Sequence, residues 1–154
     1  MSKWLTRQRF TDAVDTAIES AIRAAESRTS GEIRFVIETA LDPLAVWRGL
    51  APRERAHEVF AQFRVWDTEL RNGVLIYVLV ADRDVEILAD RGAAASISPE
   101  SWEHVARIME AAFRAGRFLE GSVAGVEAVG DLLAKRFPPG ARDRDELPNQ
   151  PALL

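Results

Sequence analysis

The sequence predicts an α/β fold, a three-layer α/β/α sandwich around a small mixed sheet. Residues 74–81 (VLIYVLVA) are apolar on both faces, which is typical of a central strand covered by helices on both sides. The turn Asp82-Arg83-Asp84 is short enough to force an antiparallel hairpin with a strand over 85–89. A first strand over 32–39 reaches residue 74 through a helical segment, which has the length of a right-handed parallel crossover.

Helices are predicted where apolar residues recur at helical spacing. The clearest start is Ser98-Pro99-Glu100, which supplies a cap, a first-turn proline and an acidic residue near the positive end of a helix. Ala115-Gly116 and Pro138-Pro139-Gly140 each end a helical pattern. The expected helices cover residues 6–28, 53–64, 98–114 and 118–137.

Composition excludes several classes of function. The chain has 154 residues, the size of one domain, and a net charge of −4, which argues against broad nucleic-acid binding. It has no cysteine, so disulfides, zinc–thiolate sites and cysteine nucleophiles are excluded. No apolar run approaches the roughly 18 residues of a membrane span, and the N-terminus lacks the apolar stretch of a signal peptide. We therefore expect a soluble, cytoplasmic protein with no membrane span.

The last part of the chain differs in composition from the rest. Residues 140–154 (GARDRDELPNQPALL) contain few apolar side chains until the end of the chain. The sequence therefore predicts a single domain over residues 1–139 and an extended or mobile C-terminal tail over residues 140–154.

Polar residues converge at one end of the predicted sheet. The second strand starts near residue 73 and the third ends near residue 89, so the loops before and after this hairpin meet there. The first strand, parallel to the second, starts at the same end. Hard cations such as calcium and magnesium prefer oxygen ligands, and the candidate metal ligands here are Glu32, Asp67, Asn72 and Asp90, with Thr68 and Arg71 beside them. The alternative is that the charged residues among them form surface ion pairs.

The opposite end of the sheet is the rival location. It carries Asp82, Arg83 and Asp84 in the hairpin turn, with Thr39 and Asp42 after the first strand. Ligands of open α/β sheets usually bind beyond the carboxyl ends of parallel strands, which favours this end. A charged hairpin turn is the simpler interpretation of the same residues.

An ordered set of motifs resembles a known family. It comprises TSGEIRFVIE (29–38), F-x-x-F-x-V (60–65), T-x-x-R-N-G-V-L-I-Y (68–77), Asp82-Arg83 and a late G-x-x-x-G-V helix ending in Phe137-Pro138. This order is similar to the TPM domain family, named after thylakoid lumen, photosystem II repair and acetylcholine-receptor-associated members. The resemblance covers about residues 5–139, and the tail around Glu146-Leu147-Pro148 looks like the soluble, single-domain branch.

The resemblance implies an α/β/α sandwich and two activities reported for some members, calcium binding and acid phosphatase activity. Phosphatase chemistry needs a nucleophile or metal-activated water, and cationic groups that hold the phosphoryl oxygens. Arg71, Arg83 and Arg91 are candidates for the cationic groups, and Asp67 or Asp90 for the nucleophile or metal ligand. The sequence contains no DxDx(T/V) element, Walker loop or Cys-x5-Arg element.

Two classes of function stay open. The first is a domain that binds a divalent cation, calcium before magnesium, with a phosphatase activity on a phosphorylated small molecule as a further possibility. The second is a non-catalytic module that binds a protein partner without a metal. An exposed apolar patch that includes Trp47 and Leu50 would favour the second class.

Overall fold

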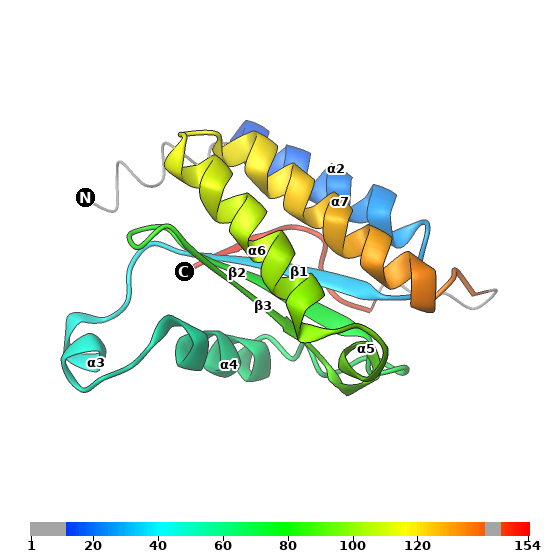
Figure 1. Ribbon diagram of the computed structural model, residues 1–154, viewed down its shortest axis with the longest axis horizontal. Coiled ribbons are helices and arrows are strands. Elements are labelled where there is room, and N and C mark those ends of the chain that lie inside the picture. The colour runs from blue at the N-terminus through cyan, green and yellow to red at the C-terminus, as the bar shows by residue number, and fades with distance from the viewer. Residues whose placement is uncertain (1–11, 141–145) are drawn as a thin grey trace.

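The computed structural model describes residues 12–140 and 146–154, so the predicted start of the first helix at residues 6–11 lies outside the described residues. The chain forms a layered α/β domain (Figure 1). The elements are α2 (Asp12–Glu26), β1 (Glu32–Glu38), α3 (Pro43–Trp47), α4 (Pro52–Gln62), β2 (Gly73–Leu79), β3 (Asp84–Ala89), α5 (Arg91–Ser96), α6 (Pro99–Arg114), α7 (Phe118–Arg136) and β4 (Ala152–Leu153).

The sheet has the predicted mixed topology, with the strand order β3-β2-β1-β4. Strand β1 is parallel to β2, with Glu32 opposite Gly73 and Glu38 opposite Leu79. Strand β3 is antiparallel to β2. Strand β2 is buried along its whole length, as the apolar sequence of 74–81 indicated, and β1 is buried along its whole length as well. The parallel crossover and the hairpin are therefore both confirmed.

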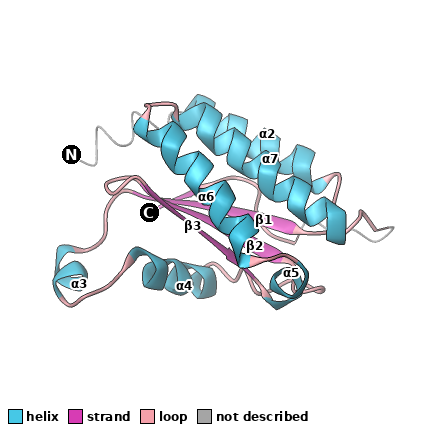
Figure 2. Ribbon diagram, viewed as in Figure 1, coloured by secondary structure: helices cyan, strands magenta, loops and turns pink. Residues whose placement is uncertain are grey.

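Helices cover both faces of the sheet, which gives the three layers (Figure 2). On one face α2, α6 and α7 pack on alternate strand residues such as Phe35, Ile76 and Ile87. On the other face α4 and the chain around Val65 pack on Leu75, Tyr77 and Leu79. The alternation follows from the pleat of a strand, which points successive side chains to opposite faces.

The end of the chain adds a strand that the sequence analysis did not predict. Ala152 and Leu153 pair with β1 in parallel, and the backbone N–H of Leu154 donates to Ile37 O at 2.8 Å. Upstream of this strand Leu147 is buried in the apolar cluster under α4. The described tail, residues 146–154, is thus extended but packed on the sheet, because Leu147 and β4 have an apolar face and a strand edge to occupy.

Two short helices of five and six residues, α3 and α5, complete the described elements. Helix α3 begins at Asp42-Pro43, which the sequence marks as a possible helix start, whereas α5 was not predicted. In the described ranges, 12–140 and 146–154, no helix is long and apolar enough to cross a membrane.

Candidate functional site

Three of the four predicted metal ligands, Glu32, Asn72 and Asp90, lie at one end of the sheet. The backbone N–H of Glu32 donates to Asn72 O at 3.3 Å, and Glu32 is the register partner of Gly73. On the other side of Gly73, the N–H of Asp90 donates to Gly73 O at 2.9 Å. Glu32 and Asp90 therefore flank Gly73 on the face of the sheet that α4 covers.

The chain at Val65 separates Glu32 from Asp90. Gly73 has no side chain, and the carbonyl group of Val65 lies so close to it that a Cβ on Gly73 would overlap with Val65 O. On one side of this segment, Glu32 accepts a hydrogen bond from the backbone N–H of Glu146, at 3.0 Å from Oε1. On the other side, Asp90 faces α5. The two carboxylates belong to separate environments.

The loop between α4 and β2 uses its polar residues internally. The Thr68 hydroxyl accepts from the N–H of Asn72 at 3.2 Å, and the Asn72 side chain donates to Ser30 at 3.5 Å. Asp67 is exposed and forms an ion pair with Arg64 at 3.0 Å. Arg71 is exposed, and its carbonyl group accepts from the N–H of Gly92 at 2.8 Å. This loop is a structural support for β2 and α5.

Among the predicted metal ligands, Asp90 has the surroundings that most resemble part of a binding site. It caps the N-terminus of α5, where its Oδ1 accepts from the N–H of Arg91 at 2.8 Å. Its side chain is buried, with the residue only 7% exposed. Its second oxygen, Oδ2, is buried and has no hydrogen-bond partner in the described part of the chain. A buried acceptor without a partner costs about 1–3 kcal/mol, so this oxygen is a candidate ligand contact.

A cavity of about 600 Å³ adjoins Asp90, and we call it the β3 cavity. Its floor is the outer edge of β3 from Glu86 to Asp90, and α4 forms one wall while α5 and α6 form the other. Its volume lies in the range of about 300–1,000 Å³ that is usual for ligand sites. The lining residues are Arg53, His57, Phe60, Glu86, Ile87, Leu88, Ala89, Asp90, Arg91, Ala94, Ile97, Pro99, Trp102, Glu103 and Ala106.

A second polar atom in the wall of the β3 cavity is also unmatched. The indole Nε1 of Trp102 is buried without an acceptor among the described residues. Arg53, by contrast, is paired with Glu86 at 3.1 Å across the cavity. Two residues that line the cavity, Asp90 and Trp102, thus each have a buried polar atom without a partner among the described residues, an acceptor and a donor.

These residues do not form a preassembled metal cage. Over residues 12–140 and 146–154, no three His, Cys, Asp or Glu side chains are grouped so that they could hold a metal ion. The predicted ligands lie in three locations: Glu32 beside Glu146, Asp67 and Asn72 on the loop before β2, and Asp90 at the start of α5.

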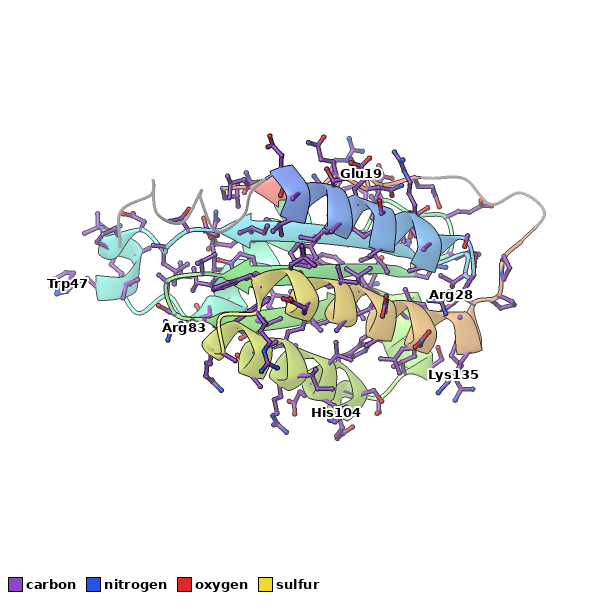
Figure 3. The ribbon with its side chains drawn as sticks, turned by 90° about the horizontal axis from the view of Figure 1, so that it is seen from above. Glu19, Arg28, Trp47, Arg83, His104 and Lys135 are labelled. Atoms are coloured by element: carbon purple, nitrogen blue, oxygen red, sulfur yellow. The ribbon has the colours of Figure 1, made fainter. Side chains whose placement is uncertain are left out.

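The rival end of the sheet contains a carboxyl group with an altered pKa. Asp82 and Arg83 are exposed in the β2–β3 turn, and Arg83 points away from the domain at the end opposite Lys135 (Figure 3). Asp84 starts β3, and burial, reinforced by the nearby charges of Glu86 and Glu110, raises the pKa of Asp84 to about 7. Glu86 and Glu110 therefore lie near Asp84, but among the described residues these carboxyl groups are not arranged to hold a metal ion.

Asp84 gives a pH-dependent prediction. Since the pKa of its carboxyl is raised from 3.8 to about 7, the folded state binds more protons than the unfolded state between these values. Its contribution to stability therefore falls as pH rises from about 4 to about 7. Asp84→Asn should remove this decline and raise the free energy of unfolding at pH 8 by about 0.5–1 kcal/mol, a modest value because the group is partly solvated.

Urea denaturation at pH 4, 6 and 8 checks the Asp84 prediction. The matched control is Asp82→Asn, two residues away on the exposed turn, which should change stability by less than about 0.5 kcal/mol at each pH. Equal pH profiles for the wild type and Asp84→Asn would contradict the assignment.

A buried polar cluster under α4 was not predicted from the sequence. Glu38 Oε1 accepts from the Tyr77 hydroxyl at 2.6 Å and from Arg55 Nε at 2.8 Å, and Arg55 also reaches Glu38 Oε2 at 3.1 Å. Burial alone would raise the pKa of Glu38, but the hydrogen bonds from Arg55 and Tyr77 lower it overall. The period-2 pattern of β1 places Glu38 on this face, but no local signal identifies Arg55 as its partner.

Helix α3 exposes apolar side chains, including Trp47, which was considered as part of an apolar patch with Leu50. Leu44 and Val46 are 52% exposed and Trp47 is 84% exposed. Figure 3 shows Trp47 pointing away from the rest of the domain. Leu50 is partly buried.

These features define an α/β sandwich with a ligand-sized cavity at the edge strand of its sheet. The chain belongs to the TPM domain family, because the sequence model described as TPM domain matches residues 6–132. The resemblance found in the sequence is thus confirmed.

Two solved structures are similar to this chain. The BA42 protein from the psychrophilic bacterium Bizionia argentinensis is 38% identical, with a TM-score of 0.82 and 94% of each chain covered. The N-terminal domain of a protein from P. gingivalis is 21% identical, with a TM-score of 0.65 and coverage of 82% of this chain and 78% of that chain, and it supports the fold alone. No curated protein matches the sequence.

Proposed function

We propose that this TPM domain binds a divalent cation, calcium before magnesium, at the Asp90 end of the β3 cavity. The observation that carries the proposal is the buried Asp90 Oδ2, a carboxylate oxygen that has no partner among the described residues and belongs to a residue lining the cavity. Carboxylate oxygens are the preferred ligands of both cations. The resemblance to the TPM family, in which calcium binding is reported for some members, supports the same choice.

The geometry supports a weak site. Asp90 supplies one carboxylate oxygen, Oδ2, that has no partner among the described residues, and Glu86 lines the same cavity. Calcium takes six to eight oxygens, so water would complete the coordination shell. We therefore expect a dissociation constant of about 10⁻⁴–10⁻³ M, as in other weakly charged calcium sites.

Phosphatase activity has less support from the arrangement of the arginines. Arg91 lines the β3 cavity, and Arg71 lies on the loop beside α5. Arg83 lies in the β2–β3 turn at the far end of the sheet. The three cannot hold one phosphoryl group together, so this activity stays a prediction from the family resemblance.

Calcium should stabilise the wild-type protein through Asp90. Calcium at 100 times its dissociation constant is expected to raise the free energy of unfolding by about 2.7 kcal/mol. Asp90→Asn should remove most of this gain, because the amide is a poor replacement for a carboxylate ligand. Urea denaturation with and without calcium measures both quantities.

Asp67→Asn is the matched control for the calcium experiment. Asp67 was predicted as a ligand, but it is exposed and paired with Arg64, so its variant should keep the full calcium response. Loss of the response in Asp67→Asn, with retention in Asp90→Asn, would place the cation on the 67–72 loop and contradict the proposal. No calcium response of the wild type would remove the cation function.

A further inference from the structure

Strand β3 is an edge of the sheet, with β2 as its neighbour on one side. In an antiparallel pair, alternate residues direct their backbone groups toward and away from the partner strand. The N–H of Asp90 donates inward to Gly73 O, and Leu75 pairs with Leu88, which fixes this alternation. The backbone groups of Val85, Ile87 and Ala89 therefore point away from the sheet.

The outward N–H groups of β3 differ in their partners. The N–H of Val85 donates to Glu110 Oε2 at 3.2 Å, which closes the beginning of the strand. For the N–H groups of Ile87 and Ala89, no acceptor is found over residues 12–140 and 146–154. Exposed strand edges of this kind are templates for pairing with another extended segment.

The unpaired part of the edge is the floor of the β3 cavity. Residues 86–90 line the cavity between α4 and the α5–α6 wall. The α5–α6 wall is mostly apolar, with Trp102 and Ala106 on α6, whereas α4 contributes Phe60 together with the polar side chains of Arg53 and His57. A strand added beside β3 would direct alternate side chains to these two walls.

We propose that the β3 cavity binds an extended peptide segment of a partner protein, which pairs with Ile87 and Ala89 as an added strand and places a basic side chain at Asp90. This interaction goes beyond cation binding, does not require it, and would compete with it for the same Asp90 oxygen. The basic side chain matches the buried acceptor of Asp90, and a peptide carbonyl matches the Nε1 of Trp102, which has no acceptor among the described residues. A second copy of this domain fits less well, because β3 lies between α4 and α6 and two such edges would bring these helices into collision.

The probe is a capped heptapeptide of alternating threonine and valine with a C-terminal lysine, added to the ¹⁵N-labelled protein in EDTA. The amide protons of Ile87 and Ala89 should shift downfield, and their hydrogen exchange should slow by at least about tenfold, since both gain an acceptor. Glu86 and Leu88 already donate to β2, so their amide protons serve as internal controls within the same strand.

N-methylation of the peptide tests backbone pairing without any change to the protein. Methyl groups on one alternate set of peptide nitrogens should weaken binding by at least about tenfold, because they remove the paired donors. Methyl groups on the other set should leave affinity nearly unchanged. The variant Ala89→Pro tests the same pairing from the side of the protein. It lacks one outward N–H but keeps the bonds to β2, and an edge strand tolerates proline at such a position.

The basic end of the peptide has its own control. Replacing the lysine with glutamate should weaken binding to the wild type by at least about fivefold but have little effect on Asp90→Asn. The proposal is overturned if millimolar peptide shifts neither Ile87 nor Ala89, if both methylated sets bind equally, or if the shifts map outside the β3 cavity. Since EDTA is present throughout, failure of the calcium experiment does not decide this one, and the reverse also holds.

Discussion

Replacing Glu38 with alanine is expected to lower the free energy of unfolding by about 3–5 kcal/mol, the cost of breaking a buried ion pair by removing one partner. The side chains of Glu38 and Arg55 are only 12% and 21% exposed. Without Glu38, the Tyr77 hydroxyl also loses its acceptor beneath α4. Urea denaturation at pH 7 measures the change.

Glu58 provides the matched control because it binds the same arginine. Arg55 reaches Glu58 Oε2 at 3.0 Å, but the Glu58 side chain is 56% exposed. Glu58→Ala should therefore cost less than about 1 kcal/mol. Similar losses for the two variants would show that burial of Glu38 has no special energetic role.

The Glu38 effect should also depend on pH. The pKa of Glu38 is lowered from 4.5 in the folded protein, so its ionised form stabilises the fold above that value. This contribution is lost as pH falls through the lower, folded-state pKa. The difference between the wild type and Glu38→Ala should shrink in strong acid.

Replacing Gly73 with alanine is expected to cost about 3 kcal/mol or more, as overpacking against a rigid neighbour does. The added Cβ would overlap with Val65 O, a backbone atom that cannot rotate away. Relief requires a shift of the chain that separates Glu32 from Asp90. Thermal and urea denaturation would report the loss.

Gly140→Ala is the control for Gly73→Ala. Within the described part of the chain, no atom lies within 4 Å of a Cβ at Gly140, so this variant should stay within about 0.5 kcal/mol of the wild type. A Gly73→Ala protein of wild-type stability would mean that Val65 does not lie over β2 as described.

The sheet could be predicted because its signals are local. The apolar run at 74–81 can satisfy both faces only as a central strand, and three turn residues permit only a hairpin. The β1–β2 crossover follows from chain length and handedness. The central position of the 74–81 strand is confirmed, since every residue of β2, and of β1 beside it, is buried.

The missed features depend on contacts between distant residues. Leu147 appeared as one apolar residue in a polar tail, yet it fills a place beside α4 that residues as distant in sequence as Val36 help to build. In the sequence, Glu38 is an ordinary strand residue and Arg55 is an ordinary helix residue. Their pairing exists only in the fold.

The candidate site was predicted only in part, because it too depends on contacts between distant residues. Strand direction brings Glu32, Asn72 and Asp90 to one end of the sheet, and the sequence shows this direction. Whether their side chains meet depends on Val65, whose position over Gly73 has no sequence signal except the glycine itself. The β3 cavity depends on how far α4 and α6 stand apart, which periodicity does not determine.

A calcium titration followed by amide NMR tests directly whether a divalent cation binds in the β3 cavity. We expect the calcium shifts to concentrate on Asp90 and the first turn of α5, to extend to Glu86 on the cavity floor, and to spare Asp67. They should be absent in Asp90→Asn. Shifts confined to residues 67–72 or 82–84, or no shift at millimolar calcium, would contradict a cation site in the β3 cavity.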